Sequence, residues 1–140
     1  MLAGDFNQGP GSTSSPNPPY TLLTTGKLPT DSPGQPPARE GAWSVELPSH
    51  FVSAYKAAKG AEPELTTMAT QVDPRNPRPD PPSFVGSIDY IFMNNGSDAA
   101  WAVKAVGRLP SLEEAKAACV SYPTADEPSD HLLLWADLSL

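Results

Sequence analysis

The sequence lacks the features that mark several common classes of protein. It contains one cysteine, Cys119, so no disulfide can form within the chain, which is compatible with a reducing compartment. No apolar run approaches the roughly 20 residues that a membrane-spanning helix needs. No basic stretch followed by an apolar one marks a signal peptide. We therefore expect no membrane segment and an intracellular location.

Basic residues are also scarce. Nine Lys and Arg stand against sixteen Asp and Glu, which gives a formal net charge of −7. A protein that holds nucleic acid through its overall field is usually basic, because it must displace counterions from the phosphates. Any contact with nucleic acid is therefore expected at a local site, helped by metal ions.

Proline, in contrast, is abundant. Eighteen of the 140 residues are proline, against a usual share of about 5%. Proline fixes φ and donates no backbone hydrogen bond, so it interrupts helices and central strands. Residues 8–18, 29–42 and 73–82 are accordingly expected to contain neither helix nor strand.

Between these loops, the patterns predict helices and strands in a mixed α/β (α+β) fold. For helices, the signals are helical spacing of apolar residues, a terminal Gly, and a capping box formed by Ser111 and Glu114. These signals predict helices over residues 20–25, 49–59 and 111–121.

Strands are expected where β-branched, aromatic or continuous apolar residues gather. The candidates are an apolar stub at residues 1–3 and strands over 87–93, 101–106 and 132–138. We predict that residues 101–106 form a hairpin with 87–93, and that the last strand is buried on both faces.

Polar residues follow or interrupt these strands at two places. Asp5 and Asn7 lie two apart and would face the same way on an extended chain, where they could orient a phosphate, a water or a hydrated Mg²⁺. The alternative is an ordinary strand-to-loop turn. Asp89 lies within an apolar strand, which is costly unless the carboxylate is paired or lies at the wet end of the strand.

The third polar stretch is Ser129-Asp130-His131, directly before the last strand. A carboxylate beside a histidine can fix its tautomer and raise its basicity. Neighbouring strand residues point to opposite faces, so these three residues are not a serine-protease triad. The stretch could also simply begin a strand.

Taken in order, Gly-Asp-Phe-Asn (4–7), Ile-Asp-Tyr-Ile (88–91) and Ser-Asp-His (129–131) resemble the endonuclease/exonuclease/phosphatase superfamily. Its deadenylase-like branch (poly(A) exonucleases, nocturnin and Angel proteins) fits best, on Tyr-Thr-Leu-Leu-Thr-Thr-Gly (20–26) and Phe-Val-Gly-Ser (84–87). The resemblance covers nearly the whole chain apart from the Pro-rich insertions.

The resemblance implies a role for each polar residue. Asp5 would help to activate the attacking water and Asn7 would contact the scissile phosphate. Asp89 would orient His131 or act near the metal, and His131 would bind or protonate at the phosphate. A Mg²⁺ or Mn²⁺ ion would be held by Asp5 and Asp130. Phe84 would stack on a substrate base, although it could equally cover the core.

The sequence also departs from that family. The family's main metal-binding Glu lies in an N-terminal half that these 140 residues do not contain. We therefore expect residues 1–140 to form a partial domain, the C-terminal half of a four-layered two-sheet α/β sandwich with long Pro-rich loops. Its apolar sheet face would be exposed.

Three functions remain open on this basis. The first is Mg²⁺-dependent hydrolysis of RNA from its 3′ end, with this chain as an inactive fragment. The second is a phosphatase that acts on a nucleotide cofactor or another small phosphoester. The third is a non-enzymatic, degenerate half-domain.

Overall fold

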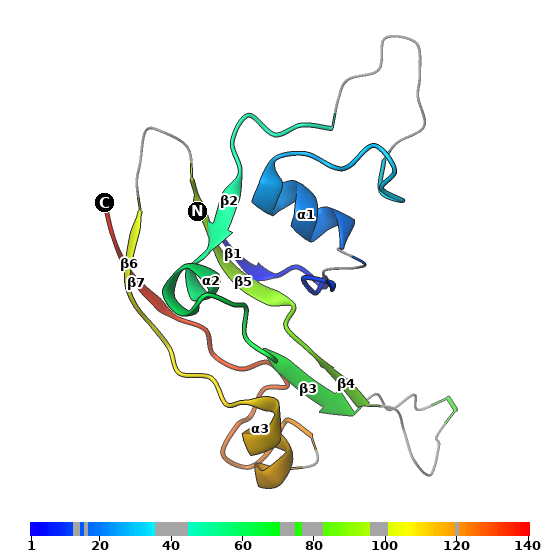
Figure 1. The fold of residues 1–140 in the computed structure, drawn as a ribbon. Helices are drawn as coiled ribbons and strands as arrows, with labels where there is room; N and C mark the ends of the chain where they lie inside the picture. Colours follow the sequence, from blue (N-terminus) through cyan, green and yellow to red (C-terminus); the bar gives the residue numbers. More distant parts are fainter. Residues whose placement is uncertain are drawn as a thin grey trace.

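The computed structural model shows a mixed α and β fold, as predicted, with small antiparallel sheets (Figure 1). It describes residues 1–12, 15, 17–35, 45–70, 75–76, 83–95, 101–119 and 121–140. Among these residues, no helix has the length and apolar character that crossing a membrane requires. The four-layered sandwich stays a prediction.

A three-stranded sheet forms the centre of the fold. Strand β5 (Asp89–Asn94) lies between β1 (Leu2–Asp5) and β2 (Phe51–Ser53), and both neighbours run antiparallel to it. The β1–β5 ladder places Asp5 directly opposite Asp89. Two carboxylates that are 84 positions apart in the sequence (89 minus 5) thus meet at one end of the sheet.

Helix α1 (Pro18–Thr25) covers one face of this sheet (Figure 1). Side chains alternate along a strand, so β5 directs Tyr90 and Phe92 to that face. There they pack with Tyr20 of α1, and the Phe6 ring meets the Phe92 ring edge-on with centroids 5.3 Å apart. This aromatic cluster fixes the segment that follows Asp5.

The helix predicted over residues 20–25 is present as α1 and begins two residues earlier, at Pro18. Asn17 caps the helix, two prolines occupy its first turn, and Gly26 ends it in the left-handed conformation at φ 80°. The helix begins at Pro18, so the loop predicted for 8–18 ends one residue earlier than expected. The described residues of that loop contain no other helix or strand.

The helix predicted over 49–59 is wrong in its first part. Residues 51–53 form β2, and α2 (Ala54–Lys59) begins only after Ser53, whose hydroxyl accepts the Lys56 N–H. Residues 51–53 form a strand because they pair with the edge of β5 that β1 does not occupy. The helix then begins after the Ser53 cap. Gly60 ends the helix as predicted, at φ 84°.

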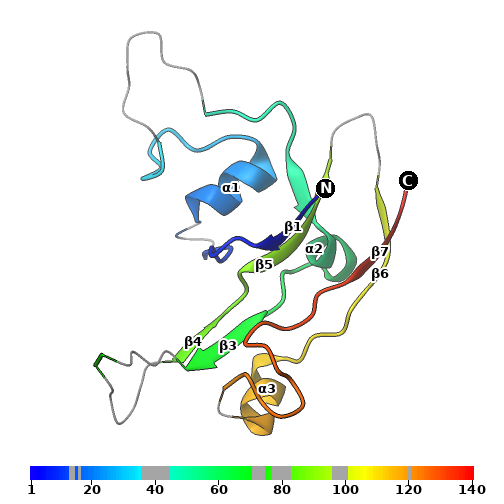
Figure 2. The same ribbon diagram turned by 180° about the vertical axis from the view of Figure 1, so that it is seen from behind.

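A hairpin of β3 (Thr67–Thr70) and β4 (Ser83–Gly86) was not predicted. Strand β4 leads through two residues into β5, so the hairpin extends the central sheet lengthwise (Figure 2). Helix α3 (Leu112–Ala118) packs against β3 through Leu65, Met68 and Ala115. The predicted Ser111–Glu114 capping box is present.

Two predictions about the remaining strands are wrong. Strand β6 (Ala102–Val106) pairs with β7 (Ala136–Ser139) and not with β5, because β1 and β2 already occupy both edges of β5. The strand predicted over 132–138 begins only at Ala136 and is not buried on both faces. Leu133 is 80% exposed and Trp135 49% exposed.

The other two predicted loops are described only in part. Residues 29–35 contain neither helix nor strand, as expected. Residues 36–42 lie outside the described residues. In the range 73–82 only Arg75 and Asn76 are described, and they form a turn.

Candidate functional site

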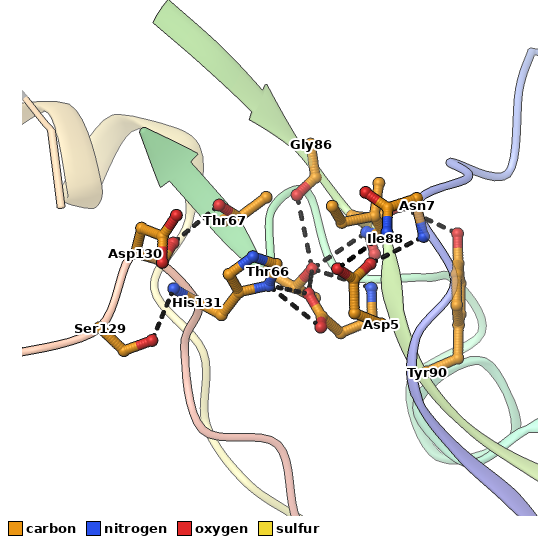
Figure 3. A network of polar contacts seen from close by, with 12 residues as sticks. Asp5, Asn7, Thr66, Thr67, Gly86, Ile88, Tyr90, Ser129, Asp130 and His131 are labelled. Carbon is orange, nitrogen blue, oxygen red and sulfur yellow. Dashed lines mark hydrogen bonds and ion pairs between the residues drawn. The ribbon is translucent and has the colours of Figure 1, made fainter. Parts of the chain in front are cut away.

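The three polar stretches converge at one end of the central sheet (Figure 3). Asp5 ends β1 and Asp89 begins β5. His131 is brought to them by the chain that follows α3. Asp5, Asp89 and His131 each offer a ligand atom, and these atoms all lie within 4.8 Å of one another. Asn7 is hydrogen-bonded to Asp5, whereas Asp130, which was also expected at the site, is not part of this cluster.

Asp5 and Asn7 form a turn of their own. The Asn7 N–H donates to Asp5 Oδ1 at 2.7 Å, and the Asn7 side-chain amide donates to Asp5 Oδ2 at 3.2 Å. Asn7 has φ 53°, in the left-handed region that Asn tolerates. The expectation of an extended chain through both residues is therefore wrong, and the turn alternative is right. The turn nevertheless keeps the two side chains together.

Asp89 and His131 form a hydrogen-bonded pair. His131 Nδ1 lies 3.1 Å from Asp89 Oδ1 and 3.0 Å from Oδ2. Because a carboxylate only accepts, Nδ1 must carry the proton. The second ring nitrogen, Nε2, is then left for a ligand or for proton transfer. The predicted orientation of His131 by Asp89 has its geometric basis here.

The hydrogen bond to Asp89 raises the pKa of His131 above its ordinary value. Burial opposes this shift, and the charges of Asp89, Asp130 and Asp5 add to it. The site therefore favours the protonated imidazole. A protonated ring beside two carboxylates can donate a proton to a developing oxyanion.

Thr66 is a member of the site that the sequence did not reveal. It is fully buried, and its hydroxyl donates to Asp89 Oδ2 at 2.6 Å. Nothing in its neighbourhood, Glu-Leu-Thr-Thr (64–67), separates it from an ordinary strand residue. Only the pairing of strands shows the contact, because 23 positions separate the two residues.

Asp130 lies at the edge of this group. Its carboxylate is not part of the three-residue cluster, and the residue is exposed. Its backbone carbonyl accepts the Thr67 hydroxyl at 2.7 Å (Figure 3). Within the described residues, Asp89 and not Asp130 is the second carboxylate beside Asp5.

Phe84 lies on β4, opposite Ala69 of β3, and is 38% exposed. Its ring lies over Gly86, where a Cβ would come within 3.1 Å of the ring tip. The residue thus forms part of an open hairpin surface rather than the core. The structure does not bring Phe84 into the cluster of Asp5, Asp89 and His131.

An open groove of about 510 Å³ runs beside Asp89 and His131. Its lining includes Ala3 and Gly4 of β1 and residues 127–129 and 131–134. Apolar side chains, among them Ile91, Leu133 and Leu134, supply most of its lining. Lys and Arg are absent from the described residues that line it.

The donor set bears on which ion could fit. Mg²⁺ and Mn²⁺ prefer oxygen ligands, and Asp5 and Asp89 supply carboxylates. Imidazole suits these ions less well, and the Nδ1 of His131 already faces Asp89. The carboxylate oxygens of Asp5 and Asp89 are therefore compatible with a divalent ion.

Comparison with known proteins adds no family to this geometry. No protein-family model matches the chain, and searches of curated proteins and of solved structures find no significant match.

Proposed function

We propose that the chain carries the Asp–His part of a metal-dependent phosphodiesterase site. The observation that supports this most is the meeting of the Asp89–His131 pair with Asp5 at one sheet end. Such a group combines a proton donor with carboxylates that could hold a divalent ion. The resemblance of the three motifs to the endonuclease/exonuclease/phosphatase superfamily supports the same assignment.

In this proposal each residue of the site has a distinct role. Protonated His131, held by Asp89, donates a proton to an oxygen of the phosphate. Asp5 accepts a proton from the attacking water or holds the ion, and Asn7 hydrogen-bonds the phosphate. A bound Mg²⁺ or Mn²⁺ would neutralise charge that develops on the phosphoryl oxygens.

The proposed substrate is RNA attacked from its 3′ end, with Phe84 as a stacking platform for a base. The groove favours a smaller substrate as a second candidate. It lacks Lys and Arg among the described residues, whereas a long polyanion is normally held by cations. A nucleotide or another small phosphoester needs fewer such contacts.

We propose further that residues 1–140 are a partial domain, and that this chain alone hydrolyses no phosphodiester at a useful rate. By resemblance, the main metal ligand is a Glu outside this sequence. The exposed side chains of Leu2, Leu133 and Trp135 support the idea of an uncovered face. They equally suit the third function, a non-enzymatic half-domain.

The test is a hydrolysis assay on the longest translated product that contains residues 1–140. Oligo(A), other RNA and small phosphoesters are compared with Mg²⁺ or Mn²⁺ present. We expect metal-dependent cleavage that His131→Ala and Asp5→Ala abolish, while Asp137→Ala on β7 leaves it unchanged. Cleavage that persists in His131→Ala would refute the assignment. The 140-residue chain, assayed in parallel, should be inactive.

A further inference from the structure

The hydroxyl group of Thr66 makes all the hydrogen bonds that it can make. Oγ1 accepts the backbone N–H groups of Ile88 at 3.0 Å and Asp89 at 3.1 Å. A hydroxyl has two lone pairs and one proton, so these two bonds leave only the proton to be placed. The Asp89 carboxylate is 2.6 Å away and the Gly86 carbonyl 3.5 Å away. The shorter contact, to a charged acceptor, decides the direction in favour of Asp89.

The backbone of Thr66 contacts both sides of the Asp89–His131 pair. Its N–H donates to Gly86, in the strand that leads to Asp89, at 2.8 Å. Its carbonyl accepts the N–H of Leu132, the residue after His131, at 2.8 Å. One buried residue therefore sets the distance between the two segments that supply the pair (Figure 3).

We propose that Thr66 is a positioning residue that holds the Asp89 carboxylate where it accepts the Nδ1–H of His131. The carboxylate is fixed at one oxygen by Thr66, so its remaining lone pairs face the ring. On the neutral ring, this places the proton on Nδ1 and leaves Nε2 unprotonated. The catalytic meaning of this arrangement rests on the proposed function, whereas the arrangement itself does not.

A purely structural role makes a different prediction. In that case the hydroxyl serves only to satisfy two buried N–H groups, and the ring of His131 would not respond to its loss. Thr67 offers a matched comparison. It is the next residue, it is also buried, and its hydroxyl donates to the Asp130 carbonyl instead of to a carboxylate.

The experiment is ¹⁵N NMR of the His131 ring in the 140-residue chain, without metal ions, at a pH where the ring is neutral. The wild type should show a protonated Nδ1 and an unprotonated Nε2. Thr66→Val should lose this preference and approach the mixture of tautomers of a solvated imidazole. Thr66→Ser should restore it, and Thr67→Val should retain it.

A folded Thr66→Val variant that keeps the wild-type ring signals would overturn the proposal. If that variant does not fold, the wild type still decides. The Thr66 hydroxyl proton should then give a resolved, slowly exchanging resonance with a cross-peak to a neighbouring site proton, and its absence would overturn the proposal. The proposed function can fail independently of this proposal. In that case the longer product would show no hydrolysis, while the His131 ring signals would still be as expected.

Discussion

Strands β5 and β7 overlap two apolar runs of the sequence, residues 87–93 and 132–138, that have very different surroundings in the fold. Strand β5 pairs on both edges and is covered by α1 on the face that carries Phe92, and both Phe92 and Met93, on the other face, are only 1% exposed. Within the described residues, strand β7 pairs only with β6, and Leu133 and Trp135 before it are largely exposed. An apolar run therefore shows what could be buried, and the available neighbours decide what is.

The candidate site joins these two regions. Asp89 begins the well-packed strand β5, and His131 lies in the sparsely covered segment that leads to β7. The Asp89 side of the site is held by the central sheet. On the His131 side, the N–H of the next residue, Leu132, donates to the Thr66 carbonyl. We expect the two regions to respond differently to substitution.

The largest difference should appear on truncation of apolar side chains. Phe92→Ala removes a buried ring from the aromatic cluster and should destabilise the fold by about 3–5 kcal/mol. Leu133→Ala removes a side chain that is 80% exposed and should change the free energy of unfolding by about 0.5 kcal/mol or less. Urea denaturation of both variants measures this. Similar losses in the two variants would mean that Leu133 is covered in solution.

A smaller effect is expected from the pair that bridges the regions. The raised pKa of His131 means that folding favours its protonated form. The resulting stabilisation is therefore fully present below the ordinary imidazole pKa and is lost as pH rises through the folded-state pKa. His131 is about one-third exposed (32%), so solvent screening limits the effect to about 1 kcal/mol.

Asp89→Asn tests this pH dependence. The variant should lower the His131 pKa and flatten the fall in stability with rising pH, as followed by NMR titration and urea denaturation. Asp137→Asn, which changes a carboxylate on β7, is the control and should leave both curves unchanged. An unchanged His131 pKa in Asp89→Asn would mean that Asp89 does not raise the His131 pKa.

The smallest effect on stability should come from a polar substitution in the exposed region. Leu133→Lys should leave the free energy of unfolding within about 0.5 kcal/mol of the wild type. It should nevertheless reduce self-association, because it breaks an exposed apolar surface with a charge. Sedimentation at several concentrations measures this. Equal self-association of the variant and the wild type would mean that the chain associates through another surface.

Local signals predicted the helices best. Ser111 and the glycines after α1 and α2 act within a few residues of their own position, so the sequence alone identifies these helix ends. Strand pairing was predicted less well. The hairpin of β3 and β4 and the partner of β6 depend on which edges are already occupied, and that information lies in distant segments.

The candidate site shows the same division. The motifs around Asp5, Asp89 and His131 indicated a shared site, and the structure brings these three residues together. The contact between Thr66 and Asp89, and the position of Asp130 outside the cluster, follow from strand register. No short motif encodes that register, because it is set by the pairing of β3 with β4.

Mn²⁺ titration followed by NMR tests most directly whether Asp5, Asp89 and His131 form the proposed divalent-ion site. Paramagnetic broadening falls off steeply with distance, so low Mn²⁺ concentrations should first broaden signals of Asp5, Asn7, Asp89 and His131. Asp5→Asn should weaken this effect, and Asp137→Asn should not. Broadening that begins elsewhere, or that is unchanged in Asp5→Asn, would contradict the proposed ion site.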